Sequence, residues 1–344
     1  MTEGNKRTAD DDNRIASEKP DSKFVSRGLF LFLDYLAISV GSWLYWIVIS
    51  KFASVNEIGV ATTVYSLVLL ASFITQLGME YPLLRRSKYD GGRALGVALL
   101  IEIMIATAAL PIILIVTNII FGGTIQDILW IGIVLLLLLS IEFVFRFFLL
   151  GSSGSKTVLV TDTIGLSIKF LSGYYLVSVG YGAYGILTAY LLEVICIVSI
   201  YFLIMNRRVS PRLSGLKYLL DFFKSALVNA PSKYSGQIIA SLSVVMLASY
   251  GLDSSDVGLF YIALLISVFL GSFASSMAFM VIPASSHSNL DLSSESIRIS
   301  LGLISPIVVI LLVGPNLVLS LIGPQYEVAN MLLFTLGIGI LPYA

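Results

Sequence analysis

Nine hydrophobic runs, each near or above the length needed to cross a lipid bilayer, fill most of this sequence. They alternate with short polar loops, and a tenth apolar run begins at Val328 and continues to the last residue, Ala344. An α-helix needs about 20 residues to span the hydrocarbon core. Because a backbone in lipid has to satisfy its own hydrogen bonds, the runs are predicted to be helices. They cover approximately residues 29–50, 58–79, 94–121, 128–150, 157–179, 181–205, 226–250, 257–282 and 299–322.

The composition is that of an integral membrane protein and excludes several other classes. The chain is 57% hydrophobic and 12% charged, with a mean hydropathy of +0.93. Its formal net charge is zero, so there is no electrostatic basis for binding nucleic acid. The single cysteine, Cys196, and the single histidine, His287, have no companions for a disulfide or a metal site. We therefore predict no metal and no cofactor.

The basic residues predict the orientation of the chain. Of the 21 lysines and arginines, 18 lie in the N-terminal tail or in every second loop that follows it. Cytoplasmic loops are enriched in these residues, so the N-terminus is predicted to be cytoplasmic and the protein to be a multi-pass protein of the cell membrane. The opposite loops are very short, which leaves no room for a soluble domain. Trp43, Tyr45, Trp46 and Trp130 fit an aromatic belt at the outer interface.

A weak repeat with an offset of about 200 residues suggests an internal duplication. Glu57-Ile58-Gly59-Val60 returns as Asp256-Val257-Gly258-Leu259, and Ile119-Ile120-Phe121-Gly122 returns as Ser320-Leu321-Ile322-Gly323. Units of six helices have an even number of crossings, so both would share one orientation about an axis along the membrane normal. The predicted fold is an all-α integral membrane bundle of two pseudo-symmetric six-helix lobes, the second incomplete. The regions are a disordered cytoplasmic tail (1–27), an N-terminal lobe (28–205), a cytoplasmic linker (206–225) and a partial C-terminal lobe of three full helices and part of a fourth (226–344).

Several short, glycine-led motifs resemble one family of transporters. They are Glu57-Ile58-Gly59, Gly182-Ala183-Tyr184-Gly185-Ile186, Val257-Gly258-Leu259-Phe260-Tyr261-Ile262-Ala263 leading to Pro283-Ala284-Ser285-Ser286, and Ile322-Gly323-Pro324-Gln325-Tyr326. In them the chain resembles the polysaccharide transporters, or O-antigen-type flippases, of the multidrug/oligosaccharidyl-lipid/polysaccharide exporter superfamily. The sequence departs from that family in having fewer helices. It also shows no acidic residue among Ser241-Leu242-Ser243-Val244-Val245, where relatives often carry one.

The resemblance implies both an architecture and a function. Two six-helix lobes would form a V around a partly hydrophilic cavity and rock to open it to alternate sides. The cargo would be a polyprenol-linked oligosaccharide, flipped from the cytoplasmic to the outer leaflet for polysaccharide or glycoprotein assembly. The expected partners are this lipid-linked glycan, membrane lipids and H⁺ or Na⁺ as a coupling ion.

Ionisable side chains inside the predicted spans are the candidate site residues. A charge at bilayer depth costs about 2.5–3.5 kcal/mol, so several in one protein indicate a polar interior. Asp34 and Lys233 are 199 residues apart, and each is followed by a tyrosine, Tyr35 and Tyr234. One hypothesis is that Lys233 attracts the lipid phosphate and pairs with Asp34 to close the cytoplasmic side. The alternative is a static pair, or two side chains that reach the headgroups separately.

The remaining buried charges have spacings that favour different roles. Glu142 and Arg146 are four residues apart, which predicts a structural ion pair along one helix. Asp162 and Lys169 are seven apart, too far for a direct bond, so each is expected to face the cavity and meet a partner elsewhere. Glu102 and Glu193, the deepest acids, could take up H⁺ or Na⁺ to drive exchange, or could form a contact between helices.

Three other functions remain to be compared with glycan flipping. The first is a multidrug or cation antiporter of the same superfamily, and the second is a truncated, non-transporting relative that acts as a scaffold. The third, a membrane-embedded glycosyl- or acyltransferase, is disfavoured because the outer loops are short and Asp253-Ser254-Ser255-Asp256 has the wrong spacing for a metal-binding Asp-x-Asp motif. We therefore predict a transporter and no enzyme activity.

Overall fold

The computed structural model describes most of the chain between residues 22 and 340. The described residues are 22–121, 125–152, 154–207, 209–285 and 311–340, together with 298, 302, 305, 306 and 309. For 22–28, 120, 231–237, 270–285 and 340 the description covers the backbone alone. The predicted tail lies almost wholly outside these residues, as do eight of the 24 residues of the predicted span 299–322.

Every regular element among the described residues is a helix, which confirms the predicted all-α membrane bundle. Five of the helices are long and apolar enough to cross a membrane by themselves: those containing residues 29–49, 55–76, 80–119, 126–151 and 182–206. The elements are α2 (Ser22–Ile49), α3 (Val55–Gln76), α4 (Glu80–Phe121), α5 (Gln126–Gly151), α6 (Ser155–Ser178), α7 (Gly182–Asn206), α8 (Leu216–Ser249), α9 (Ser254–Ser285), α11 (Pro315–Ile322), the 3₁₀ helix η1 (Pro324–Ala329) and α12 (Asn330–Ile340).

Two helices begin well before the predicted spans. α4 starts at Glu80 and bends at Asp90, where the backbone leaves helical geometry. α8 starts at Leu216, so part of the predicted linker 206–225 is helical. Both extensions carry arginines or lysines, which made them resemble loops in the sequence. They are helical because apolar side chains on them pack into the protein, as the fully buried Phe222 does.

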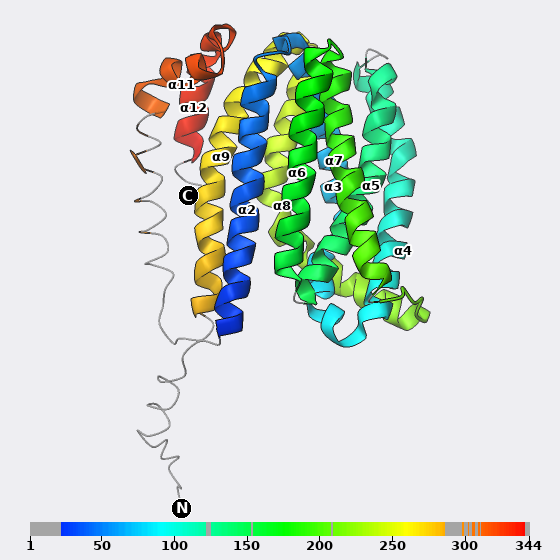
Figure 1. The fold of residues 1–344 in the computed structure, drawn as a ribbon. Helices are drawn as coiled ribbons and strands as arrows, with labels where there is room; N and C mark the ends of the chain where they lie inside the picture. Colours follow the sequence, from blue (N-terminus) through cyan, green and yellow to red (C-terminus); the bar gives the residue numbers. More distant parts are fainter. Residues whose placement is uncertain are drawn as a thin grey trace, which may run out of the picture.

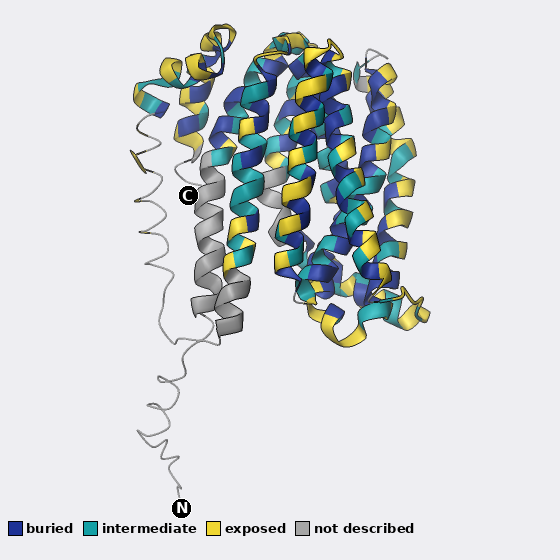
Figure 2. Ribbon diagram, in the orientation of Figure 1, coloured by how far each residue is buried: buried dark blue, intermediate teal, exposed yellow. Residues whose placement is uncertain are grey.

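The long helices lie side by side in one bundle, with α12 against α9 at its edge and α11 beside α12 (Figure 1). Buried residues face neighbouring helices, and exposed residues face outward (Figure 2). The exposed set contains many large apolar side chains, including Met104, Ile112, Ile115 and Ile119 on α4. In water so large an apolar surface would be unfavourable, whereas in lipid it is the expected surface of a membrane helix.

The contact between α3 and α9, one helix from each predicted repeat unit, is reciprocal. A methyl group at Gly59 would lie 1.6 Å from the carbonyl oxygen of Ser254, and one at Gly258 would lie 2.3 Å from the carbonyl oxygen of Val55. Val55 and Ser254 are 199 residues apart, as are Gly59 and Gly258. This reciprocity is what a local two-fold axis between the two predicted units would produce, and the repeat stays a prediction. Glycines permit this close approach of the two helices.

Candidate functional site

One arginine joins three helices in the interior of the bundle. The Nη2 atom of Arg146 on α5 lies 2.5 Å from Oδ2 of Asp34 on α2 and 3.2 Å from Oδ2 of Asp162 on α6. The hydroxyl of Tyr201 on α7 donates to the other oxygen of Asp162 over 2.6 Å. The side chains of Asp34 and Asp162 are 3% and 4% exposed, against 21% for Arg146. These four residues are called the Arg146 cluster below.

The local packing explains how the Arg146 cluster forms. α6 and α7 approach closely at Gly165, where a methyl group would lie 2.5 Å from the side chain of Ile197. This close approach brings Tyr201 within reach of Asp162. A guanidinium group has five N–H donors in a fixed plane and stays protonated, so one arginine can hold two carboxylates from different helices.

A second ion pair, formed by Lys169 and Glu193, connects α6 to α7. Lys169 Nζ lies 3.0 Å from Oε1 of Glu193. The same ammonium lies over two aromatic rings, 4.7 Å from the ring centre of Tyr190 and 5.5 Å from that of Tyr45. Both distances are within the range of cation–π attraction. Lys169, Glu193, Tyr45 and Tyr190 are called the Lys169 cluster below.

A third polar contact joins α3 to α4. The hydroxyl of Thr75 donates to Oε1 of Glu102 over 3.1 Å, and both residues are fully buried. One turn of α3 carries a further side-chain bond, from Nε2 of Gln76 to Oγ of Ser72 over 2.8 Å. Glu102 therefore forms a hydrogen-bonded contact between two helices. A contact of this kind is one of the two roles predicted for Glu102 from the sequence.

The structure corrects the predicted pairing of Glu142 with Arg146. Among the described residues, the ion-pair partners of Arg146 are Asp34 and Asp162. The i, i+4 rule ranks neighbours within one helix and carries no information on which other helices lie nearby. Asp34 and Asp162 are buried on α2 and α6, and without the guanidinium each ionised carboxylate would lack its counter-ion.

The other predicted site residues are placed as follows. Asp162 and Lys169 have separate partners on α5 and α7. Asp34 bonds to Arg146, while the side chains of Lys233 and Tyr234 lie outside the described residues, so the pairing of Asp34 with Lys233 stays a prediction. Tyr35 is half-buried on α2.

Sequence reasoning missed three tyrosines that belong to these clusters. Tyr45 was assigned to an interfacial belt, but it is fully buried, as is the adjacent Trp46. Tyr190 and Tyr201 were not singled out at all. Their signal is a polar hydroxyl on an otherwise apolar helix that also carries an acid, Glu193. Trp130 is 57% exposed and fits the predicted belt.

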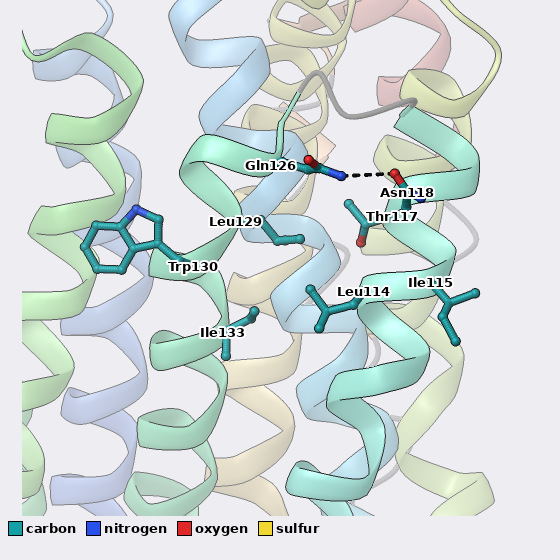
Figure 3. Close-up of a pocket in the computed structure, with 8 residues that line it drawn as sticks. All are labelled: Leu114, Ile115, Thr117, Asn118, Gln126, Leu129, Trp130 and Ile133. Atoms are coloured by element: carbon teal, nitrogen blue, oxygen red, sulfur yellow. Dashed lines mark hydrogen bonds between the residues drawn. The ribbon is translucent and has the colours of Figure 1, made fainter.

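A groove of about 470 Å³ lies between α4 and α5, apart from the buried charges. Figure 3 shows Gln126 of α5 beside Asn118 of α4 at one end of this groove, where the Gln126 amide donates to Asn118 Oδ1 over 3.0 Å. The lining is otherwise mainly apolar, and its residues are Leu114, Ile115, Thr117, Asn118, Gln126, Leu129, Trp130 and Ile133. No group of three or more metal-ligating side chains occurs in the part of the chain that the structure describes.

Solved structures with a similar fold are transporters. A "MATE in complex with MaD5" superposes with a TM-score of 0.61 at 17% identity, covering 93% of this chain and 80% of that one. An "inward-facing conformation of a multidrug resistance MATE family transporter of the MOP superfamily" gives 0.60 at 14%, covering 93% and 77%. An outward-facing conformation with the same description gives 0.58 at 15%, covering 94% and 80%. No protein-family model and no curated protein matches the sequence. At these identities the likeness concerns the fold.

Proposed function

We propose that this protein is a cation-coupled exporter of the cell membrane that works by alternating access. The observation that carries the proposal is the imbalance of charge inside α2–α7. Their bilayer-depth segments contain two basic residues, Arg146 and Lys169, and a larger number of acids. The acids are Asp34, Glu102, Glu142, Asp162 and Glu193.

An excess of buried carboxyl groups favours cation uptake. If all of them were ionised, the interior would carry net negative charge, and each uncompensated charge would cost about 2.5–3.5 kcal/mol. Binding of H⁺ or Na⁺ removes that cost. A cation that binds one arrangement of the helices more tightly than another shifts the equilibrium between them, which is the requirement for coupling.

The contact between α3 and α9 supplies the element that would move. Gly59 and Gly258 lie near the predicted outer ends of these helices, where the two repeat units touch. Opening towards the outside requires this contact to separate, and it consists of close backbone packing. A movement of one unit against the other would alter the surroundings of Asp34, because α2 packs against both α6 and α9.

The cargo that the fold neighbours favour is an amphipathic organic molecule. Two of the neighbours are described as multidrug resistance transporters, one facing inward and one outward. The second candidate is flipping of a polyprenol-linked oligosaccharide. It is favoured by the sequence motifs and by the apolar groove between α4 and α5, since a groove on the lipid-facing surface suits a cargo that keeps its tail in the bilayer.

Transport by the purified chain in liposomes tests the proposal. Vesicles preloaded with ethidium are given an H⁺ gradient, a Na⁺ gradient or neither, and release is followed by fluorescence. We expect release that requires one of the two gradients and that is abolished in the double variant Asp34→Asn/Asp162→Asn. The matched control, Asp221→Asn, changes an exposed acid and should transport normally. The proposal fails if no gradient produces release of ethidium or movement of a fluorescent polyprenol-linked sugar.

A further inference from the structure

The Lys169 cluster has the composition of a binding site for an organic ammonium ion, and the protein's own lysine fills it. A carboxylate lies on one side of the ammonium, and the faces of two tyrosine rings lie within 4.7 and 5.5 Å of it. Aromatic faces together with an anion are the groups that bind alkylammonium ligands. The Lys169 side chain is only 3% exposed, so this ammonium exchanges most of its hydration for these contacts.

The walls of the cluster are held by contacts that do not involve the lysine. The Tyr45 ring packs edge-on against Trp46, Phe170 and Tyr190, with ring centres 5.7, 5.7 and 5.6 Å apart. Tyr190 in turn lies 4.2 Å from Tyr65, measured between ring centres.

Gly173, one turn along α6 from Lys169, has no side chain and so leaves space for the Tyr45 ring. A methyl group there would lie 2.6 Å from Cε2 of Tyr45. The rings are therefore fixed by α2, α3, α6 and α7, and the site should persist when the lysine is shortened.

We propose that Tyr45, Tyr190 and Glu193 form a binding site for a primary alkylammonium ion, for which Lys169 is a tethered occupant. An external cation competes with the lysine for Glu193 and for the ring faces. Displacement of Lys169 would break the ion pair between α6 and α7 and so connect cation binding to the packing of these helices. The inference rests on the proposed function in one respect only, which is that the competing cation is a transported cargo. Binding of the cation can be measured without transport.

The size of the missing group defines the ligand for a direct test. Lys169→Ala removes Cγ, Cδ, Cε and Nζ, and n-propylammonium restores those four heavy atoms. The variant, purified as the full chain, is titrated with propylammonium chloride while its thermal unfolding is followed. Since a ligand that binds only the folded state stabilises it, the unfolding temperature should rise with concentration. 1-Propanol has the same size without the charge, and we expect it to bind at least about tenfold more weakly.

Three controls separate a cation site from a space that is simply empty. Lys156→Ala removes an exposed lysine at the start of the same helix and should not respond to the amine. Lys169→Met fills the space with an uncharged chain and should not respond either. Lys169→Ala/Glu193→Gln should lose the preference for propylammonium over propanol. Equal stabilisation of Lys169→Ala by both compounds, or by neither, would overturn the proposal.

The yield of folded protein gives a second measurement that does not depend on a stable purified variant. Cells expressing Lys169→Ala are grown with propylammonium, with 1-propanol or with neither, and the monodisperse protein extracted from membranes is compared. A higher yield with the amine alone supports the site, and equal yields in all three cultures contradict it. Since neither assay involves transport, absence of ethidium release would count against the proposed function and leave the binding result standing.

Discussion

The two repeat units meet in a reciprocal contact but differ sharply in their interiors. Gly59 and Gly258 occupy equivalent positions, and each lies against the backbone of the other unit. Yet the spans of α2–α7 contain seven ionisable residues, whereas in the spans 226–250, 257–282 and 299–322 Lys233 is the sole one. Under the proposed function, we expect cation binding to belong to the first unit, which carries the charged residues, and not to the second.

The strongest test of that assignment is removal of the arginine that organises the charged interior. Arg146→Met leaves Asp34 and Asp162 buried without their counter-charge. Breaking a buried ion pair from one side typically costs about 3–5 kcal/mol, so we expect the largest loss of stability here. Thermal unfolding in detergent measures it.

Two variants of the same residue type show whether charge is the cause. Arg85→Met changes an exposed arginine on α4 and should stay within about 0.5 kcal/mol of the wild type. Arg146→Lys keeps one positive charge but loses the planar group that holds both carboxylates, and should be intermediate. An Arg146→Met protein as stable as the wild type would show that the two aspartates are uncharged in the folded state.

The converse change places an acid in the apolar unit. Val244 on α8 is fully buried, and Val244→Asp adds a carboxyl group at that buried position. We expect a loss of about 2.5–3.5 kcal/mol, measured by the same unfolding assay. The isosteric control Val244→Thr adds a hydroxyl group without charge and should cost less. If Val244→Asp were as stable as Val244→Thr, the second unit would tolerate charge and the contrast between the units would fail.

The parts of the fold that the sequence predicted are those governed by one physical constraint. The bilayer sets the length of each hydrophobic run, so α5, Gln126–Gly151, was predicted to within two residues as 128–150. The repeated motif around Gly59 and Gly258 could be seen in the sequence because the close contact of α3 with α9 requires glycine at both positions. By contrast, α8 begins ten residues before its predicted start, since charged residues at the membrane surface are compatible with either a helix or a loop.

The sequence singled out the ionisable residues inside the bundle but did not identify the partners that the structure gives them. Asp34, Asp162, Lys169 and Glu193 stood out because charge is rare at bilayer depth. Which of them bond depends on which helices are neighbours, and α2 is far in the sequence from α5 and α6, with Asp34 112 residues before Arg146. Spacing rules could therefore propose Glu142 for Arg146 but could not reveal Asp34. Tyrosines such as Tyr201 are harder still, because an isolated tyrosine is common in apolar helices.

The reciprocal contact predicts equal effects from two distant substitutions. Gly59→Ala and Gly258→Ala each place a methyl group against a backbone carbonyl, and overpacking of this kind typically costs about 1–3 kcal/mol. Because both act on one contact, the double variant should lose less than the sum of the two. Gly215→Ala, where a methyl group meets open space, is the control. Additive losses of stability would show that the two glycines act independently and do not stabilise one shared contact.

The smallest expected effect comes from the polar contact between α3 and α4. Thr75→Val keeps the shape of the side chain and removes the hydroxyl that donates to Glu102 over 3.1 Å. A hydrogen bond to a neutral group contributes about 1 kcal/mol and one to an ionised group about 1.5–3 kcal/mol. The same hydroxyl also lies 3.0 Å from the carbonyl oxygen of Ser72, so the charge on Glu102 is read from the coupling energy between Thr75 and Glu102 and not from the loss in Thr75→Val alone. We expect about 1 kcal/mol, because a protonated Glu102 avoids the cost of a charge at a fully buried site. Glu102→Leu removes the acceptor, so the double-mutant cycle of Thr75→Val with Glu102→Leu measures the coupling energy. A coupling near zero would show that the hydroxyl does not stabilise Glu102. One of about 3 kcal/mol would identify Glu102 as ionised and so increase the difference in charge between the first unit and the apolar second unit.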